Sequence, residues 1–234
     1  MFDQNYTLTS SAGARERSIL RNVYIWMTAG LALTGIVAYG VATNPRLLQM
    51  FFSSQFTFFG IIIAQFILVF ALSARVMSMS ISTATICFAA YATLNGITLS
   101  LIFLIYTGSS IASVFFITAG TFAGMSLYAV TTKRDLSGVG HYCIMALWGL
   151  IIASVVNIFL KSDGLSWIIS FIGILVFVGL TAYDTQRIKR WNQETGASSD
   201  EAVFVRLSIL GALHLYLDFI NLFLYLLRFF GKRR

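Results

Sequence analysis

Seven long apolar stretches joined by short polar segments dominate this sequence. They cover about Asn22–Ala42, Phe56–Ala74, Ser82–Tyr106, Ser110–Thr131, His141–Leu160, Leu165–Asp184 and Leu207–Leu227. Each has about the 20 residues that an α-helix needs to cross the hydrocarbon core of a bilayer. Because unpaired backbone cannot face lipid, the stretches predict an all-α integral membrane protein with seven transmembrane helices.

The composition excludes a large soluble domain. Hydrophobic residues make up 58% of the 234 residues and charged residues 11%, whereas soluble domains carry about 25% charged residues. The mean hydropathy is +0.82. We therefore expect a polar N-terminal tail at 1–20, a seven-helix domain at 21–231 and a basic C-terminal tail at 232–234. The lipid bilayer is the partner that this composition requires.

The positive charges predict an orientation. The net charge is +7, but the basic residues lie where apolar stretches end, which is typical of topology signals and lipid-headgroup contacts and not of nucleic-acid binding. A cytoplasmic N-terminus leaves only Arg46 and Lys161 in the outer loops. The inner segments then hold Arg15, Arg17, Arg21, Arg75, Lys133, Arg134, Arg187, Lys189, Arg190 and Arg206.

The C-terminal end opposes this orientation, because seven crossings place Arg228, Lys232, Arg233 and Arg234 outside. A last segment that re-enters the membrane would bring these residues inside. We favour seven crossings, since Leu207–Leu227 is long enough to span. The prediction is a multi-pass protein of the plasma membrane, or of the inner membrane in a bacterium.

Small residues predict where helices approach closely. Ala92 and Gly96 are four residues apart, as are Gly120 and Gly124, and such pairs let helix backbones pack tightly. Packing inside the bundle is the favoured explanation, and a dimer interface is the alternative. The two cysteines, Cys87 and Cys143, lie within apolar stretches and indicate packing positions, with no spacing typical of a metal site.

Three ionisable residues are candidates for function, because charges within membrane spans are costly and mark functional sites. Asp218 is the deepest, since no charged residue lies between Arg206 and Arg228 apart from Asp218 itself. Asp184 closes the sixth stretch, and Arg75 follows the second.

Uncharged polar residues could line a hydrated interior. His214, Asp218 and Asn221 stand at i, i+4 and i+7, on one face of the seventh helix. Asn95 in the third stretch and Asn157 in the fifth are further pore-lining candidates. Each also has a structural explanation, because amides and imidazoles within spans often form hydrogen bonds that hold helices together.

Two carboxylates that approach one another could act as a pH switch. Repulsion between like charges favours one shared proton over two ionised groups, and Arg75 could neutralise one of the two. The ionised pair of Asp184 and Asp218 also offers oxygen ligands for Ca²⁺, which makes it a candidate for a weak metal site. The two aspartates differ in expected depth, because Asp218 lies ~18 Å beyond Arg206 at the helical rise, whereas Asp184 closes its stretch. Their pairing therefore requires tilt, an inward continuation of the sixth helix through Arg190, or a water-filled cavity.

Enzyme motifs are incomplete or missing. Tyr183-Asp184 fits the first half of an intramembrane aspartyl protease site, but Tyr216-Leu217-Asp218 lacks the Gly-x-Gly-Asp of the second half. Neither an H-E-x-x-H zinc motif nor a G-x-S-x-G serine elbow occurs. We expect no enzyme activity and no cofactor beyond transient Ca²⁺.

Three longer motifs carry a family resemblance. They are Thr131-Thr132-Lys133-Arg134-Asp135-Leu136-Ser137, Phe177-Val178-Gly179-Leu180-Thr181-Ala182-Tyr183-Asp184-Thr185-Gln186 and Leu215-Tyr216-Leu217-Asp218-Phe219-Ile220-Asn221-Leu222-Phe223. Together they resemble the Bax inhibitor-1 (transmembrane BAX inhibitor motif) family. The resemblance extends from about Arg21 onward, and the short N-terminal tail is similar to the bacterial branch.

The resemblance implies a seven-helix fold whose central helix is wrapped by the others, and a pH-sensitive calcium leak. Asp184 and Asp218 match the aspartate pair that senses pH in that family, and Arg75 matches the arginine that bridges one aspartate in the other state. Gly96-Ile97-Thr98-Leu99-Ser100 lacks the Gly-Pro step that some members carry. Those members include one that restrains a membrane AAA protease, so a modulator of such a protease or of a stress pathway is the alternative to a cation leak.

Overall fold

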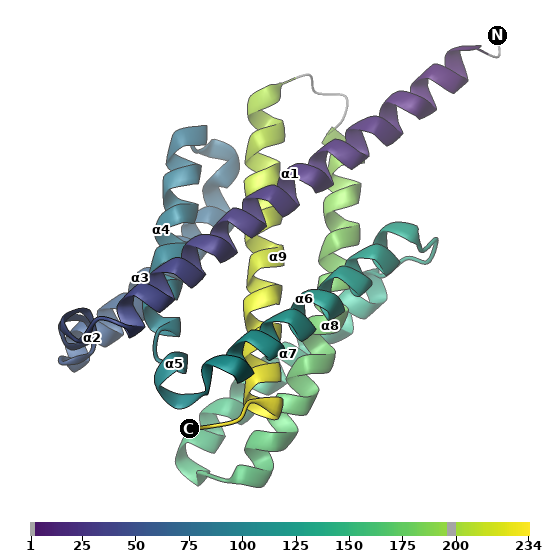
Figure 1. Ribbon diagram of the computed structural model, residues 1–234. Helices are drawn as coiled ribbons and strands as arrows, with labels where there is room; N and C mark the ends of the chain where they lie inside the picture. The colour runs from purple at the N-terminus through teal and green to yellow at the C-terminus, as the bar shows by residue number, and fades with distance from the viewer. Residues whose placement is uncertain (1–2, 196–199) are drawn as a thin grey trace. The chain divides into compact units, whose positions relative to one another are not determined.

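Helices account for nearly all of the chain in the computed structural model, which describes the backbone of residues 3–195 and 200–234 and the side chains of 19–191 and 200–234. Within these ranges the α-helices shown in Figure 1 are α1 (Asp3–Ala42), α2 (Pro45–Phe52), α3 (Gln55–Arg75), α4 (Ile81–Leu99), α5 (Ile102–Ile105), α6 (Gly108–Thr131), α7 (Ser137–Leu160), α8 (Asp163–Thr195) and α9 (Glu201–Phe230). A 3-10 turn, η1 (Val76–Ser78), follows α3.

Seven segments of the described chain are long and apolar enough to cross a membrane, which confirms the predicted all-α, seven-helix fold. They are Ile19–Ala42, Gln55–Ser78, Ile81–Ile105, Gly108–Thr131, Ser137–Leu160, Asp163–Trp191 and Glu201–Phe230. The sixth extends beyond its predicted end at Asp184, because α8 continues to Thr195. The last span is the most buried of the seven, with 67% of its most apolar stretch buried, as expected of a central helix.

The predicted N-terminal tail is helical where its backbone is described, since α1 begins at Asp3. Its side chains up to residue 18, including those of Arg15 and Arg17, lie outside the described residues. The connection between α1 and α3 holds the short helix α2. Asn44 caps α2 by accepting hydrogen bonds from the backbone of Arg46 and Leu47. Pro45 occupies the first turn of α2, where its missing N–H costs nothing.

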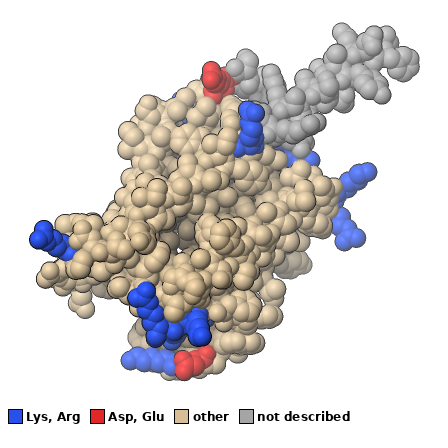
Figure 2. All heavy atoms as spheres, viewed as in Figure 1, with Lys and Arg blue, Asp and Glu red and all other residues tan. Residues whose placement is uncertain are grey.

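The chain divides into two compact units. Unit 1 comprises residues 1–105 and 188–216, and unit 2 comprises residues 106–187 and 217–234. Both α8 and α9 therefore contribute residues to each unit. Figure 2 shows broad uncharged areas on the visible face, with Lys and Arg in small clusters. This distribution is what a lipid-facing surface requires, because charges in the hydrocarbon are costly.

In unit 1, α1 packs closely on α4 through small residues. Ala92 is fully buried, and a Cβ placed on Gly96 would lie 2.7 Å from both the Thr34 carbonyl oxygen and the Val37 Cβ. Thr34 strengthens the same contact, because its hydroxyl donates to the Ala92 carbonyl at 2.9 Å. The predicted close packing at Ala92 and Gly96 is thus confirmed as an intramolecular contact.

A tyrosine from α9 completes this core of unit 1. The Tyr216 hydroxyl lies 2.7 Å from the Thr34 hydroxyl, and its ring packs edge-on against the rings of Phe88 and Tyr91. Tyr216 is fully buried, so its hydroxyl needs the partner that Thr34 provides. The hydrogen bond and the ring contacts together hold α1, α4 and α9 in one register.

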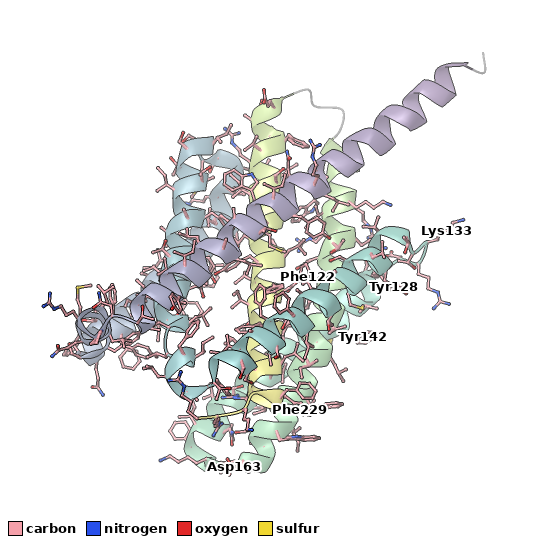
Figure 3. The ribbon with its side chains drawn as sticks, in the orientation of Figure 1. Phe122, Tyr128, Lys133, Tyr142, Asp163 and Phe229 are labelled. Carbon is pink, nitrogen blue, oxygen red and sulfur yellow. The ribbon has the colours of Figure 1, made fainter. Side chains whose placement is uncertain are left out.

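In unit 2, aromatic residues join α6 to α9. Phe219 makes edge-on contacts with Phe115 and Phe122, each with ring centroids 5.5 Å apart, and Figure 3 labels Phe122 where α6 passes α9. The other small pair behaves differently from its prediction. A Cβ on Gly120 or Gly124 would meet no described atom within 4 Å, so these glycines do not form the expected packing contact within unit 2.

The end of the chain is held against the start of α6. The Lys232 carbonyl accepts a hydrogen bond from the Thr107 N–H at 3.1 Å, and the Lys232 N–H donates to the Ser110 hydroxyl at 2.9 Å. Arg233 forms an antiparallel bridge with Tyr106. Gly231 makes this turn possible, because a Cβ there would overlap the Tyr106 ring.

We predict that Gly96→Ala destabilises the protein by about 1–3 kcal/mol, because the added methyl forces α1 and α4 apart. The matched control is Gly60→Ala on α3, where a Cβ meets nothing within 4 Å. That change should be neutral or stabilise by up to about 1 kcal/mol through helix propensity. Unfolding of the purified variants in detergent would measure both, and equal stability of the two would contradict the packing described.

Candidate functional site: a carboxyl pair in unit 2

The candidate site is formed where α8 and α9 bring Asp184 and Asp218 together within unit 2. Their carboxyl groups interact through charge and as hydrogen-bond partners, and the two residues are only 7% and 4% exposed. The expected difference in depth between the two aspartates is removed because α8 continues to Thr195. Asp184 therefore lies well inside the helix. The inward continuation of the sixth helix was one of the three geometries expected.

The two carboxyl groups have different surroundings. A carboxyl oxygen of Asp184 lies 3.9 Å from the guanidinium of Arg187, one turn later on α8, and the Arg187 side chain is 40% exposed. In contrast, Oδ2 of Asp218 is buried and has no hydrogen-bond partner among the described residues. Cys143 on α7 lies close enough to Asp218 for an electrostatic interaction between its thiol and the carboxyl group. Asp218 is therefore the member of the pair whose charge is least compensated.

One turn of α8 connects the site to the other elements of unit 2. Tyr183 packs against Gly140 of α7 so closely that a Cβ there would overlap the tyrosine ring. The Thr185 hydroxyl donates to the Ser126 hydroxyl of α6 at 3.4 Å. Gln186 forms hydrogen bonds with the loop that joins α6 to α7. Each residue of this turn thus contacts a different element, which fixes the rotation of α8 and the direction of Asp184.

Arg75, the predicted counter-ion, belongs to unit 1, whereas the carboxyl pair belongs to unit 2. It is the basic residue in the last turn of α3, and its side chain is exposed. Its carbonyl accepts hydrogen bonds from the Ser78 hydroxyl and the Met79 N–H. The pairing of Arg75 with either aspartate stays a prediction.

The polar candidates on α9 flank Asp218 along the helix. His214 belongs to unit 1, where its ring lies edge-on to Trp191 with centroids 5.8 Å apart. Asn221 belongs to unit 2, and its side-chain amide donates to the Leu217 carbonyl at 2.8 Å. The predicted polar stripe is therefore present on one face of α9, but its members lie in different surroundings.

The remaining two asparagines take part in local hydrogen bonds. Asn95 donates to the Tyr91 carbonyl of its own helix at 3.2 Å. Asn157 donates to the Ser166 hydroxyl at 2.7 Å and thereby joins α7 to α8. Because Ser166 precedes Asp184 by 18 residues on α8, Asn157 lies ~27 Å along the helix from the carboxyl pair. This geometry matches the structural explanation for Asn157.

Sequence reasoning missed two amides that join elements. Gln65 on α3 donates to the Leu94 carbonyl at 2.9 Å and to the Thr98 hydroxyl at 3.2 Å, which ties α3 to α4 in unit 1. Gln186 plays the corresponding part in unit 2. The available signal was the position of each glutamine beside or within an apolar stretch, where a polar amide requires a partner.

Comparison with known proteins decides the family. A sequence model described as "Inhibitor of apoptosis-promoting Bax1" matches residues 16–234. This chain belongs to the Bax inhibitor-1 family. The match includes all three motifs on which the resemblance was based, and with them Asp184 and Asp218.

Bacterial relatives share this family membership over almost their full lengths. "Inner membrane protein YbhL" of Escherichia coli (strain K12) is 50% identical over 218 residues, which are 93% of each chain. A protein of Borreliella burgdorferi is 46% identical over 219 residues, 94% of each chain. A protein of Rickettsia prowazekii is 45% identical over 241 aligned residues that span both chains completely. The predicted bacterial branch is confirmed.

The pair by itself is not a complete metal site. No group of three or more His, Cys, Asp or Glu that could hold a metal ion occurs among the described residues. Tight Ca²⁺ sites supply six to eight oxygens, so two carboxyls alone cannot retain the ion. Carboxyl groups of this kind offer oxygen atoms that can take up a proton or contribute to the coordination of a cation.

We predict that Asp218→Asn stabilises the protein at neutral and alkaline pH. The amide removes a poorly compensated buried charge and can donate a hydrogen bond to Asp184. The gain should increase as the pH rises, because a higher pH ionises both carboxyls of the wild-type pair. Melting temperatures in detergent should rise by a few degrees, about the shift expected for 1 kcal/mol in a chain of this size. Asp163→Asn at the start of α8 is the control, and a fall with Asp218→Asn would contradict this description.

Proposed function

We propose that this protein is a pH-sensitive cation leak of the bacterial inner membrane, with Ca²⁺ as the principal candidate ion. The observation that carries the proposal is the buried Asp184–Asp218 pair, in which one oxygen of Asp218 has no hydrogen-bond partner among the described residues. A buried carboxylate needs a proton, a cation or water to compensate its charge. Proton and cation therefore compete for the same oxygens.

Protonation of the pair provides a gating step. When the pair shares a proton, the two carboxyls attract one another and hold α8 to α9. When both ionise, they repel one another and become available as oxygen ligands. A change in pH thus alters both the contact between the helices and the affinity for cations. The family membership supports this assignment, and the relative named as an inner membrane protein supports the location.

The orientation completes the proposal. The distribution of Lys and Arg supports an orientation with the N-terminus, the α6–α7 loop and the end of α8 in the cytoplasm. In this orientation, Asp184 lies on the cytoplasmic side of the span, one turn before Arg187. We propose no enzyme activity, because the carboxyl pair lacks the glycines of the intramembrane protease motif and the sequence has no zinc or serine-nucleophile motif.

We predict that Asp218→Asn abolishes the pH dependence of cation flux, because the amide cannot exchange the proton. Ca²⁺ flux into liposomes that contain only the purified protein would be measured from about pH 6 to pH 8. Asp163→Asn makes the same chemical change outside the pair and should keep the wild-type profile. An unchanged profile in Asp218→Asn would remove the gating role from the pair.

Absence of flux from wild-type protein at every pH would instead contradict the leak itself. The alternative, a modulator of a membrane AAA protease or a stress pathway, predicts this result together with co-purification of a partner.

We also predict that Arg75→Gln brings the ratio of fluxes at about pH 6 and pH 8 toward one. As the family resemblance implies, we propose that the Arg75 guanidinium stabilises one ionised aspartate. The uncharged amide of the glutamine cannot replace that positive charge. The control is Arg46→Gln, which removes an exposed arginine from α2, in the connection between α1 and α3. The proposed orientation assigns this connection to the membrane surface opposite to that of Arg75. Equal ratios in wild type and Arg75→Gln would show that the pair titrates without Arg75.

A further inference from the structure

One side chain, that of Gln186, fastens the loop between α6 and α7 (Thr132–Leu136) to α8. Its Oε1 accepts a hydrogen bond from the Leu136 N–H at 2.8 Å, and its Nε2 donates to the Arg134 carbonyl at 2.8 Å. Gln186 is 8% exposed. Because one bond needs an acceptor and the other a donor, only a side chain with both can hold the loop at these two points.

The loop also carries an apolar anchor. Leu136 is 5% exposed and packs with Ala129 of α6 and Ala182 of α8. The two alanines leave room for the leucine between the helices. Ala182 and Gln186 lie two residues before and two residues after Asp184 on α8. Both attachments of the loop are therefore at the level of the carboxyl site along the helix, on the opposite face of α8.

The tip of the loop is in contact with solvent. Lys133, Arg134 and Asp135 are exposed, and Figure 3 labels Lys133 at this end of unit 2. Water can therefore replace the two amide hydrogen bonds when the loop lifts, which keeps the cost of release low. Lifting would also withdraw Leu136 from between α6 and α8.

We propose that Gln186 is a positioning residue that latches the Thr132–Leu136 loop closed, and that release of this latch opens the seam between α6 and α8 at the level of Asp184. The latch itself is independent of the proposed function. Its role as a gate for ions rests on the proposed function. The arrangement assigns a purpose to the Thr131–Ser137 motif and to Gln186, neither of which the carboxyl pair explains.

The latch can be tested by labelling a buried thiol. In a background with Cys87→Ala and Cys143→Ala, Leu136→Cys places a single thiol under the loop. Adding Gln186→Met should increase its rate of reaction with a water-soluble maleimide by about tenfold or more, because both amide hydrogen bonds are lost. The matched control is Gln65→Met, which removes a comparable interhelical amide from unit 1 and should change the rate by less than about twofold. Equal labelling with and without Gln186→Met would overturn the latch.

A second variant excludes a merely structural effect. A protonated carboxylic acid can donate and accept as the amide does, whereas a carboxylate only accepts and repels the Arg134 carbonyl. With Gln186→Glu, labelling should therefore be slow in acidic buffer and fast in alkaline buffer, relative to the Gln186 background at the same pH. A ratio that does not change with pH would overturn the proposed hydrogen bonds. The charged groups around this position, which all variants share, are Asp184, Arg187, Lys189 and Arg190 on α8 and Lys133, Arg134 and Asp135 in the loop, with Asp218 of α9 next to Asp184.

Flux measurements separate the latch from the gate. In liposomes, Gln186→Met with native cysteines should increase Ca²⁺ flux several-fold at the pH where wild type conducts least, while Gln65→Met should not. Faster labelling without increased flux would overturn the gating role and leave the latch in place. No flux from wild type would overturn the proposed function and the gating role together, whereas the labelling experiment would still decide the latch.

Discussion

Two carboxyl groups, buried side by side where α8 and α9 meet, are the constraint that the rest of unit 2 has to accommodate. Asp184 lies near the partly exposed Arg187, whereas Asp218 has a buried oxygen without a hydrogen bond among the described residues, so a charge on Asp218 is costly. In the proposed function, the pair responds to whatever supplies positive charge, whether a proton or a cation. A protein that only needed stability would place an apolar residue at either position.

The rest of unit 2 keeps this unfavourable pair in place. The turn of α8 around Asp184 contacts α7 through Tyr183, α6 through Thr185 and the α6–α7 loop through Gln186. Asp218 is followed on α9 by Phe219, whose ring packs between aromatic side chains of α6. The packing and hydrogen bonds of these neighbouring residues offset the free-energy cost of burying the two carboxyl groups side by side.

The sequence allowed the number and order of the spans and the two candidate aspartates to be predicted, because both follow from local properties, whereas their pairing was implied by the family resemblance. Hydropathy identifies segments that suit lipid, and a lone aspartate in such a segment stands out. It could not show that α8 continues to Thr195, because a helix that leaves the membrane becomes polar without ending. It also could not show that Gly120 and Gly124 lack a contact in unit 2 while Gly96 has one, since both pairs have the same spacing. The hydrogen-bond partners of Gln65 and Gln186 could not be predicted either, because they lie in segments distant in sequence.

The attachment of the C-terminus to α6 has a consequence for biosynthesis. The N–H of Thr107, the residue that caps α6, is satisfied by the carbonyl of Lys232, two residues before the last residue of this sequence. During translation α6 is made long before Lys232, so the Thr107 N–H lacks this acceptor until that part of the chain has been synthesised. Unit 2 therefore completes its folding only after synthesis has passed Gly231, and a chain that stops short of that glycine leaves the start of α6 without its acceptor.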